Sequence, residues 1–358
     1  MNIKNYLLTA FAKLGKKLFK RNPAADHFLI VSTTGLGDSL WATPAIRSLK
    51  ESFPEAQIDI LTSGVGAAVF KNNPHLNEIF VLGKPAFFSF LSLLRKMRRR
   101  SICTVLIFHT SQRPVLPLCY FLGESEVVGS MGQNKGLDNL LTNRVDVYKE
   151  HEIARRLRIV GAVGAQALAL DLEVFLDPCA LNEAEKIVGS VPSYIPLVAL
   201  HPGAKDRYKQ WPAGHFVKLG KQLQDQLGCQ LIVTGSKEEE GLVKSVAEQL
   251  AGSIAIAGQL SVLGLAALYK RCALVIANDT GPMHLALSVQ TPTVALFTPT
   301  DPLDCGPYQN PRCKVIAKER TCTPCFRKKC RDPFCLRQIS VEEVQSLILW
   351  PERLPRPS

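Results

Sequence analysis

The chain has 358 residues, of which 46% are hydrophobic and 21% charged, and its formal net charge is +12. This composition is ordinary for a globular protein, and the length favours two domains over one hydrophobic core. No apolar run reaches the ~20 residues that a transmembrane helix requires. We therefore expect a two-domain protein without a membrane span.

The excess positive charge lies in two segments, 1–25 and 84–100, which contain Lys and Arg but no Asp or Glu. In both segments apolar residues stand at helical spacing beside the basic ones, as at Ile3, Leu7 and Phe11. Such a helix is typical of a protein that lies on an anionic membrane surface. The alternative is a solvated basic face above an apolar stripe that packs on the core. No nucleic-acid-binding signature accompanies the charge, so we expect no nucleic-acid partner.

Taken in chain order, the first half alternates strands with helices and Gly-bearing turns. A strand at 28–32 leads through a Gly-rich turn into a helix at 40–50. Further strands are predicted at 58–61, 79–82, 102–108 and 127–128. This alternation predicts a parallel sheet that is covered by helices on both faces.

The alternation breaks in a Pro-containing stretch and then restarts with strands at 197–200, 230–234, 254–257, 273–277 and 293–297 and a helix at 211–227. We therefore predict an α/β chain of two doubly wound lobes that face one another. A ligand is expected in the cleft, at the carboxyl ends of the strands. The predicted divisions are a basic amphipathic segment 1–25, a first lobe 26–176, a linker 177–195, a second lobe 196–345 and a tail 346–358.

The turn after the strand at 273–277 is suited to a phosphate. Residues 278–284 read Asn-Asp-Thr-Gly-Pro-Met-His and precede a second apolar run. A helix that opens here presents unpaired N–H groups and about half a positive charge. Thr280 is predicted to cap this helix, and Pro282 suits its first turn. His284 either reaches a phosphate or a sugar, or is a structural residue.

The turn after the first strand carries Gly35, Gly37 and Asp38. It is similar to a dinucleotide-binding fingerprint, but Leu40 stands where that fingerprint needs a third small residue, which argues against a nicotinamide cofactor. The two glycines instead allow a substrate to approach the backbone. Asp38 either accepts a proton from that substrate or caps the following helix.

Three pairs of segments together resemble one family. They are residues 35–38 with 43–45, 201–204 with 209–212, and 278–284 with 299–302. In this order they resemble the motifs of the bacterial lipopolysaccharide heptosyltransferases, glycosyltransferase family 9, over about residues 28–345. The resemblance implies a GT-B fold, which consists of two Rossmann-like domains with doubly wound parallel sheets that face a cleft. It places the acceptor mainly on the first lobe and the nucleotide-sugar on the second.

The resemblance also implies an activity. It is the inverting, metal-independent transfer of heptose from ADP-heptose to the inner core of lipopolysaccharide, at the cytoplasmic face of the inner membrane. The lack of an Asp-x-Asp pair agrees with a reaction that needs no metal. The alternatives are a glycosyltransferase of this fold with another nucleotide-sugar or a protein acceptor, and a non-catalytic protein that binds a nucleotide or glycolipid.

The family's roles can be carried onto matching positions. Asp38 matches the general base, on a loop whose Gly35 and Gly37 lie on the acceptor side. Lys209 matches the lysine that neutralises the departing diphosphate; the alternative is a surface lysine beside Trp211. The residues that match the donor site, or are placed to contribute to it, are Gly203, Ala204, Asp279, Thr280, Gly281 and His284. Glu239 or Glu240 is placed to meet the ribose; the alternative is that these glutamates form the solvated start of a helix.

Four cysteines lie close together near the end of the second lobe. Cys322, Cys325, Cys330 and Cys335 fall within 14 residues. This spacing predicts a structural zinc or iron site, with two disulfides or four free thiols as the alternatives. Similar clusters occur in only some members of the family, so the resemblance implies no catalytic role. The basic residues at 327–329 and 331 are placed to meet acidic groups of an acceptor.

Overall fold

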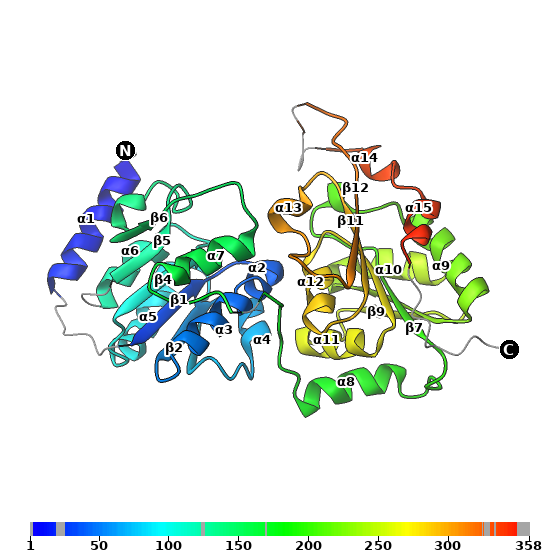
Figure 1. The fold of residues 1–358 in the computed structure, drawn as a ribbon, viewed down its shortest axis with the longest axis horizontal. Helices are drawn as coiled ribbons and strands as arrows, with labels where there is room; N and C mark the ends of the chain where they lie inside the picture. The colour runs from blue at the N-terminus through cyan, green and yellow to red at the C-terminus, as the bar shows by residue number, and fades with distance from the viewer. Residues whose placement is uncertain are drawn as a thin grey trace. The chain divides into compact units, whose positions relative to one another are not determined.

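The computed structural model describes residues 3–18, 26–122, 126–168, 170–323, 325, 330–332 and 334–348. The chain divides into two compact units, Met1–Phe175 and Leu176–Ser358. In the part of the chain that is described, each unit contains a six-stranded, entirely parallel sheet with helices packed against it (Figure 1). The predicted α/β class with two doubly wound sheets is confirmed.

The sheet of the first unit has the strand order β3-β2-β1-β4-β5-β6. Every residue of β1 is buried, because helices cover both faces of this central strand. The strands are β1 (His27–Ser32), β2 (Gln57–Thr62), β3 (Glu78–Val81), β4 (Thr104–His109), β5 (Glu126–Ser130) and β6 (Asn143–Val145).

The helices of the first unit include one departure from the prediction. The helix expected at 40–50 begins at Thr43, because Pro44 fits the first turn of a helix but not its interior, and the expected turn before it forms a separate short helix. Trp41 and Ala42 lie between them. The helices are α1 (Ile3–Leu18), α2 (Leu36–Leu40), α3 (Thr43–Ser52), α4 (Gly64–Phe70), α5 (Ala86–Arg98), α6 (Val115–Cys119) and α7 (Glu152–Gly161).

The sheet of the second unit has the order β12-β11-β10-β7-β8-β9. Its central strands β7 and β10 are buried along their whole length. The strands are β7 (Leu197–His201), β8 (Gln230–Gly235), β9 (Ile254–Ala257), β10 (Leu274–Asn278), β11 (Thr293–Phe297) and β12 (Cys313–Ala317).

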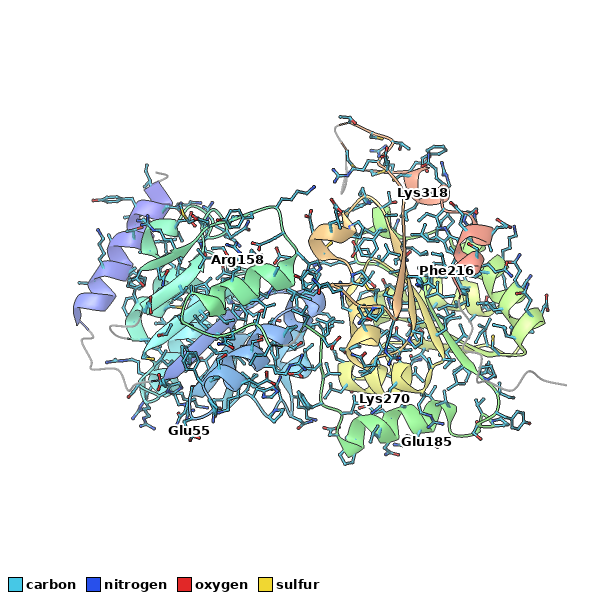
Figure 2. All side chains as sticks on the ribbon, viewed as in Figure 1. Glu55, Arg158, Glu185, Phe216, Lys270 and Lys318 are labelled. Atoms are coloured by element: carbon cyan, nitrogen blue, oxygen red, sulfur yellow. The ribbon has the colours of Figure 1, made fainter. Side chains whose placement is uncertain are left out.

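The linker predicted at 177–195 contains a helix, α8, which the sequence analysis did not identify. The Asp177 side chain caps α8 by accepting a hydrogen bond from the Ala180 N–H at 2.8 Å. The helix packs on α11. Helix α9 begins after Pro212 and turns Phe216 into the core (Figure 2). The helices are α8 (Pro178–Val188), α9 (Ala213–Leu227), α10 (Glu240–Ala247), α11 (Val262–Arg271), α12 (Gly281–Ser288), α13 (Pro302–Cys305), α14 (Phe334–Arg337) and α15 (Val341–Ser346).

The described helices include none with both the length and the apolar character needed to cross a bilayer. The strand order of each sheet reverses direction once, between β1 and β4 in the first unit and between β7 and β10 in the second. Consecutive helices leave such a reversal point toward opposite faces, so the carboxyl ends of the two strands stay uncovered. These strand ends are where each unit can hold a ligand.

The basic segment 84–100 does not form one free patch. At its end, Arg100 donates two hydrogen bonds to the fully buried Asp59, from Nε at 2.9 Å and from Nη2 at 3.0 Å. His27 Nε2 lies 2.8 Å from the same carboxylate. Arg100 therefore ties the end of α5 to β1 and β2 and is not available to a membrane or a substrate.

We expect Asp59→Ala to lower the free energy of unfolding by about 3 kcal/mol, because it leaves Arg100 and His27 without their buried partner. Urea denaturation followed by circular dichroism measures the loss. Glu55→Ala, which removes an exposed carboxylate of the same unit (Figure 2), should change the value by less than about 0.5 kcal/mol. Equal effects of the two substitutions would show that the Asp59 cluster adds nothing to stability.

Candidate active site

The candidate residues of the first unit lie at its strand-order reversal. The loop after β1 carries Gly35 and leads into α2, where Asp38 is the third residue. The side chain of Asp38 is 28% exposed. Gly35 occupies the N-cap position, so Asp38 is not the helix cap. A Cβ built at Gly35 would meet only the Asp38 carboxylate, at 3.9 Å, so the space beside this loop is open.

A buried arginine, which the sequence analysis missed, holds the Asp38 carboxylate. Arg156 on α7 has no exposed side-chain surface, and its Nη2 donates to Asp38 Oδ1 at 3.2 Å. Its Nη1 donates to Glu152 Oε2 at 2.6 Å, and its guanidinium lies 5.6 Å from the centre of the Trp41 ring. The Glu152–Arg156 spacing of four residues was a helical ion-pair signal in the sequence, but nothing local linked it to Asp38.

Glu152 supplies the second negative charge of this cluster. Burial alone would raise the pKa of Glu152, but Arg156 and Arg155 outweigh burial and hold that pKa at about 2. Arg155 also donates to the Phe108 carbonyl at 3.0 Å, which fixes α7 to the end of β4. Two carboxylates and two guanidiniums therefore compensate one another beneath the open loop.

His109, the last residue of β4, completes the surroundings of Asp38. Burial lowers its pKa, although the negative charge of Asp38 acts in the opposite direction. The ring is therefore neutral at neutral pH. Its Nδ1 is buried without a hydrogen-bond partner among the described residues, and the sequence analysis did not single it out.

In the second unit Asn278, at the end of β10, joins the segments that carry the candidate residues. Its fully buried amide donates to the carbonyl oxygens of Pro202, at 2.9 Å, and Gly203, at 3.2 Å. Its Oδ1 accepts the backbone N–H of Trp211 at 3.0 Å. One side chain thus holds the loop after β7 and the segment around Lys209 against the end of β10.

Lys209 is not a free surface lysine. It ends a single 3-10 turn, η3 (Arg207–Lys209), and its Nζ lies 2.5 Å from Asp279 Oδ2. The Thr300 hydroxyl donates to the same oxygen. Asp279 is almost fully buried, so it orients the ammonium group of Lys209 beside the first turn of α12.

The start of α12 differs from the prediction in one detail. Thr280 is the N-cap residue, but its side chain accepts no capping hydrogen bond and instead donates to the Asn278 carbonyl at 3.3 Å. The N–H groups of Gly281 and Met283 are therefore not capped by Thr280, while Pro282 has no N–H to satisfy. His284 is buried beneath this turn, with 2% of its surface exposed.

The structure brings Gly203 and Glu239 together. A Cβ at Gly203 would lie 2.3 Å from the carboxyl carbon of Glu239, so no larger residue fits there without displacing Glu239. The Ser236 N–H donates to Glu239 Oε2 at 2.8 Å and fixes the carboxylate. Ala204, which follows, is buried. Nearby, burial lowers the pKa of His201 to about 4, so this histidine adds no positive charge at neutral pH.

The four cysteines do not assemble a metal site in the described part of the chain. There, no three His, Cys, Asp or Glu side chains are placed to hold an ion, and the four cysteines are free thiols. Cys335 is buried on α14 and Cys322 is exposed. Residues 327–329 lie outside the described part.

A family model described as glycosyltransferase family 9 (heptosyltransferase) matches residues 149–334, just over half of the chain. The chain belongs to glycosyltransferase family 9. The match includes α7 of the first unit and both candidate segments of the second. This family 9 member is therefore a glycosyltransferase, as the resemblance implied.

Known proteins agree with this assignment. The chain is 25% identical to lipooligosaccharide heptosyltransferase 2 of Campylobacter jejuni over 323 aligned residues. The alignment covers 87% of this chain and 93% of the relative. A glycosyl transferase family 9 structure from Veillonella parvula matches with a TM-score of 0.81 and 20% identity, over 91% of this chain and 97% of that one. The Escherichia coli ADP-heptose lipopolysaccharide heptosyltransferase II matches with a TM-score of 0.71 and 21% identity, over 89% and 98%. The GT-B fold is confirmed.

The low pKa of Glu152 makes stability depend on pH. The pKa of Glu152 is about 2 in the folded protein and 4.5 for an unperturbed glutamate, as in the unfolded chain. The ionised carboxylate therefore stabilises the fold fully above about pH 4.5, and this contribution disappears as the pH falls toward 2. We expect Glu152→Gln to lower the free energy of unfolding at pH 7 by about 3 kcal/mol and to flatten its decline in acid.

Chemical denaturation across this pH range tests the prediction, with Glu240→Gln as the control. The pKa of Glu240 is also about 2, through its bonds to Lys237 and Lys244, but those lysines are exposed and their attraction is screened by water and salt. The control should leave the profile nearly unchanged. An unchanged acid limb in Glu152→Gln would contradict the role assigned to the buried cluster.

Proposed function

We propose that this family 9 member transfers heptose from ADP-heptose to the inner core of lipopolysaccharide. The names of the Campylobacter relative and of the Escherichia coli structure support this donor and acceptor. The observation that carries the proposal is the Asp38 carboxylate. It stands at an open strand end, does not cap its helix and is oriented by the buried Arg156.

In the proposed reaction Asp38 is the general base. Its carboxylate takes the proton of the acceptor hydroxyl while the hydroxyl oxygen forms a bond to C1 of the heptose. The bond from C1 to the diphosphate oxygen breaks on the opposite side, so the configuration at C1 inverts and ADP leaves. General-base assistance of this kind is typically worth about 10²–10⁴-fold in rate. Gly35 and Gly37 leave the acceptor room beside the carboxylate.

The second unit supplies the donor half. The diphosphate is proposed to bind at the start of α12, at the backbone of Asp279, Thr280 and Gly281, where N–H groups and the helix dipole favour negative charge. Gly203 and Ala204 line the same site from the end of β7. Lys209 neutralises the charge that develops on the leaving diphosphate.

Three donor-side residues take supporting roles in this proposal. Asp279 holds Lys209 in place, since the two form an ion pair of 2.5 Å. Glu239, fixed against Gly203, is placed to accept hydrogen bonds from the ribose hydroxyls. His284 is buried, so of its two predicted roles we assign it the structural one, which is to support the turn at the start of α12.

The proposed chemistry places the leaving-group charge on Lys209 and α12 and uses no metal ion. The cysteine segment, predicted as a structural zinc or iron site, is given no part in the reaction. The four thiols as described do not form such a site, so no step of the reaction passes through it.

We also propose that the enzyme works at the cytoplasmic face of the inner membrane, in peripheral contact with anionic lipid. The basic residues in segments 1–25 and 84–100 other than Arg100 support this location, since neither segment contains an acid. The acceptor carries a lipid anchor, so a membrane-bound enzyme meets it in two dimensions rather than three.

Replacement of the general base tests the reaction. We expect Asp38→Asn to lower kcat for transfer by about 10²–10⁴-fold, because the amide takes no proton, while the Kd for ADP stays within about twofold. Mass spectrometry of the acceptor measures transfer, and isothermal titration measures ADP. Asp171→Asn, a carboxylate of the first unit outside the site, is the control. Turnover at the parent rate in Asp38→Asn would refute the role of Asp38.

A titration with ADP, UDP and GDP tests the donor. We expect ADP to bind at least about tenfold more tightly than UDP, because a site shaped for a purine leaves polar groups unpaired around a pyrimidine. Preference for UDP would point to a different nucleotide-sugar. Transfer from ADP-heptose to a peptide but not to a core oligosaccharide would show that the acceptor is a protein.

A further inference from the structure

The first helix docks on its unit with an unusual face inward. Asn5, Thr9 and Ala12 of α1 are buried. The Asn5 amide donates to the carbonyl oxygens of Lys135, at 3.2 Å, and Gly136, at 3.1 Å. The most deeply buried face of α1 is therefore made of polar and small side chains, and beside it Leu8 and Phe11 pack in part on the hydrophobic core.

Four large apolar residues of α1 point outward instead. Ile3, Tyr6, Leu7 and Leu14 are between 52% and 78% exposed. An amphipathic helix of a globular protein normally buries such a stripe against the core. The alternative raised by the sequence, an apolar stripe packed on the core, therefore fails for these four residues. Phe11 is only half-buried.

A second helix extends the exposed apolar surface. Phe87, Phe88 and Leu91 of α5 are 38%, 69% and 40% exposed. The Phe87 ring lies 6.2 Å from that of Phe11 on α1, so the two helices share one surface. We call the seven exposed residues on these helices the apolar face: Ile3, Tyr6, Leu7, Leu14, Phe87, Phe88 and Leu91.

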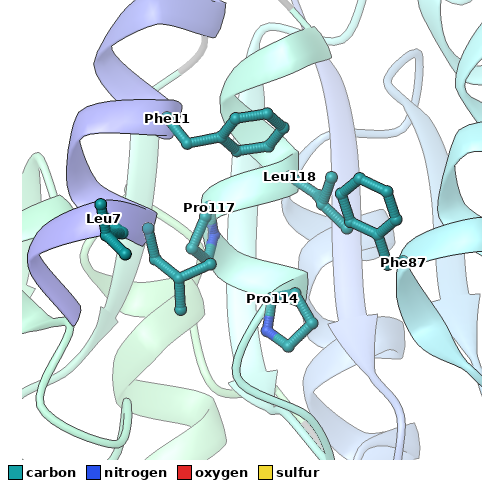
Figure 3. A pocket seen from close by; sticks show the side chains of 7 residues that line it. Leu7, Phe11, Phe87, Pro114, Pro117 and Leu118 are labelled. Carbon is teal, nitrogen blue, oxygen red and sulfur yellow. The ribbon is translucent and has the colours of Figure 1, made fainter. Parts of the chain in front are cut away.

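A pocket of about 270 Å³ opens within the apolar face, where α1, α5 and α6 meet (Figure 3). Only apolar side chains line it: Leu7, Leu8, Phe11, Phe87, Pro114, Pro117 and Leu118. Its volume lies below the roughly 300–1,000 Å³ of a drug-sized ligand site. It therefore suits the end of one hydrocarbon chain rather than a whole lipid.

Basic side chains surround the apolar face. They are all exposed and lie on or next to the two helices: Lys4 and Lys13 on α1, Lys84 before α5, and Arg95 and Lys96 near the end of α5. Neither segment contains an acid. A second copy of this chain would bring the same positive charges against these ones across a symmetric interface, which costs free energy. An anionic bilayer offers both hydrocarbon and the opposite charge.

We propose that the apolar face enters an anionic bilayer and that the pocket takes the end of an acyl chain from one of its lipids. This inference rests on the membrane contact proposed above and adds the residues that make it. The basic residues meet the phosphate headgroups, and α1 lies in the plane of the interface with Asn5 and Thr9 toward the protein.

Flotation of the full chain with vesicles tests the face. We expect binding to phosphatidylglycerol vesicles and weak binding to phosphatidylcholine vesicles. The double variant Leu7→Ser with Phe88→Ser should lower the partition coefficient by roughly tenfold or more, since each side chain loses burial in hydrocarbon. The matched control is Leu181→Ser with Tyr194→Ser, which removes an exposed leucine and an exposed aromatic residue of the second unit. Equal binding of both double variants would overturn the proposal.

A second measurement tests the pocket itself. Phe87→Trp places a fluorescent ring in the pocket wall, and its emission, taken as the difference from the parent protein, should be quenched by lipids with brominated acyl chains. Binding without quenching would mean headgroup contact only and would overturn the acyl-chain site. A lipid-free dimer in sedimentation velocity that the Leu7 and Phe88 substitutions dissociate would show that a second copy covers the face.

Transfer to a delipidated, water-soluble core acceptor separates this inference from the proposed function. The Leu7 and Phe88 variant should keep the parent kcat on that acceptor. Loss of vesicle binding with full transfer supports the docking surface. A parent protein that binds vesicles but transfers no heptose would refute the proposed function and leave the docking surface standing.

Discussion

The reversal of strand order in each parallel sheet is the constraint on which the rest of the structure depends. A strand's helix must cross to one face of the sheet, and at the reversal successive helices cross to opposite faces. The carboxyl ends of β1 and β4, and of β7 and β10, are therefore left without a cover. Asp38 and His109 stand at the first of these places, and Gly203 and Asn278 stand at the second.

The two units solve the problem of an open strand end in different ways. The first relies on buried charge, since Arg156 is desolvated and has to be compensated by Glu152 and Asp38. That requirement orients the carboxylate while leaving it partly exposed. The second relies on the backbone, because Asn278 joins three segments, and the ion pair of Lys209 with Asp279 lies beside them. A carboxylate base needs orientation, whereas a diphosphate site needs unpaired N–H groups.

The fold class and the family could be predicted from the sequence because both depend on the spacing of nearby residues. Strand, glycine turn and helix follow one another within a few residues, so the α/β class and the two doubly wound sheets were predictable. The motifs around Asp38, Lys209 and Asp279 identified the family for the same reason. Boundaries failed where a proline changed the local rule, as between α2 and α3, and where a helix, α8, lay inside a Pro-containing stretch.

The sequence by itself determined the order of elements, the family and the candidate residues, because these follow from which side chains are neighbours along the chain. Only the tertiary structure decided that Arg156 bonds to Asp38, which lies 118 residues earlier in the sequence, and that Arg100 is paired with the buried Asp59. It alone decided that α1 turns Asn5 inward and Leu7 outward. Periodicity reveals that a helix has two faces, but the surface on which it docks decides which face is buried.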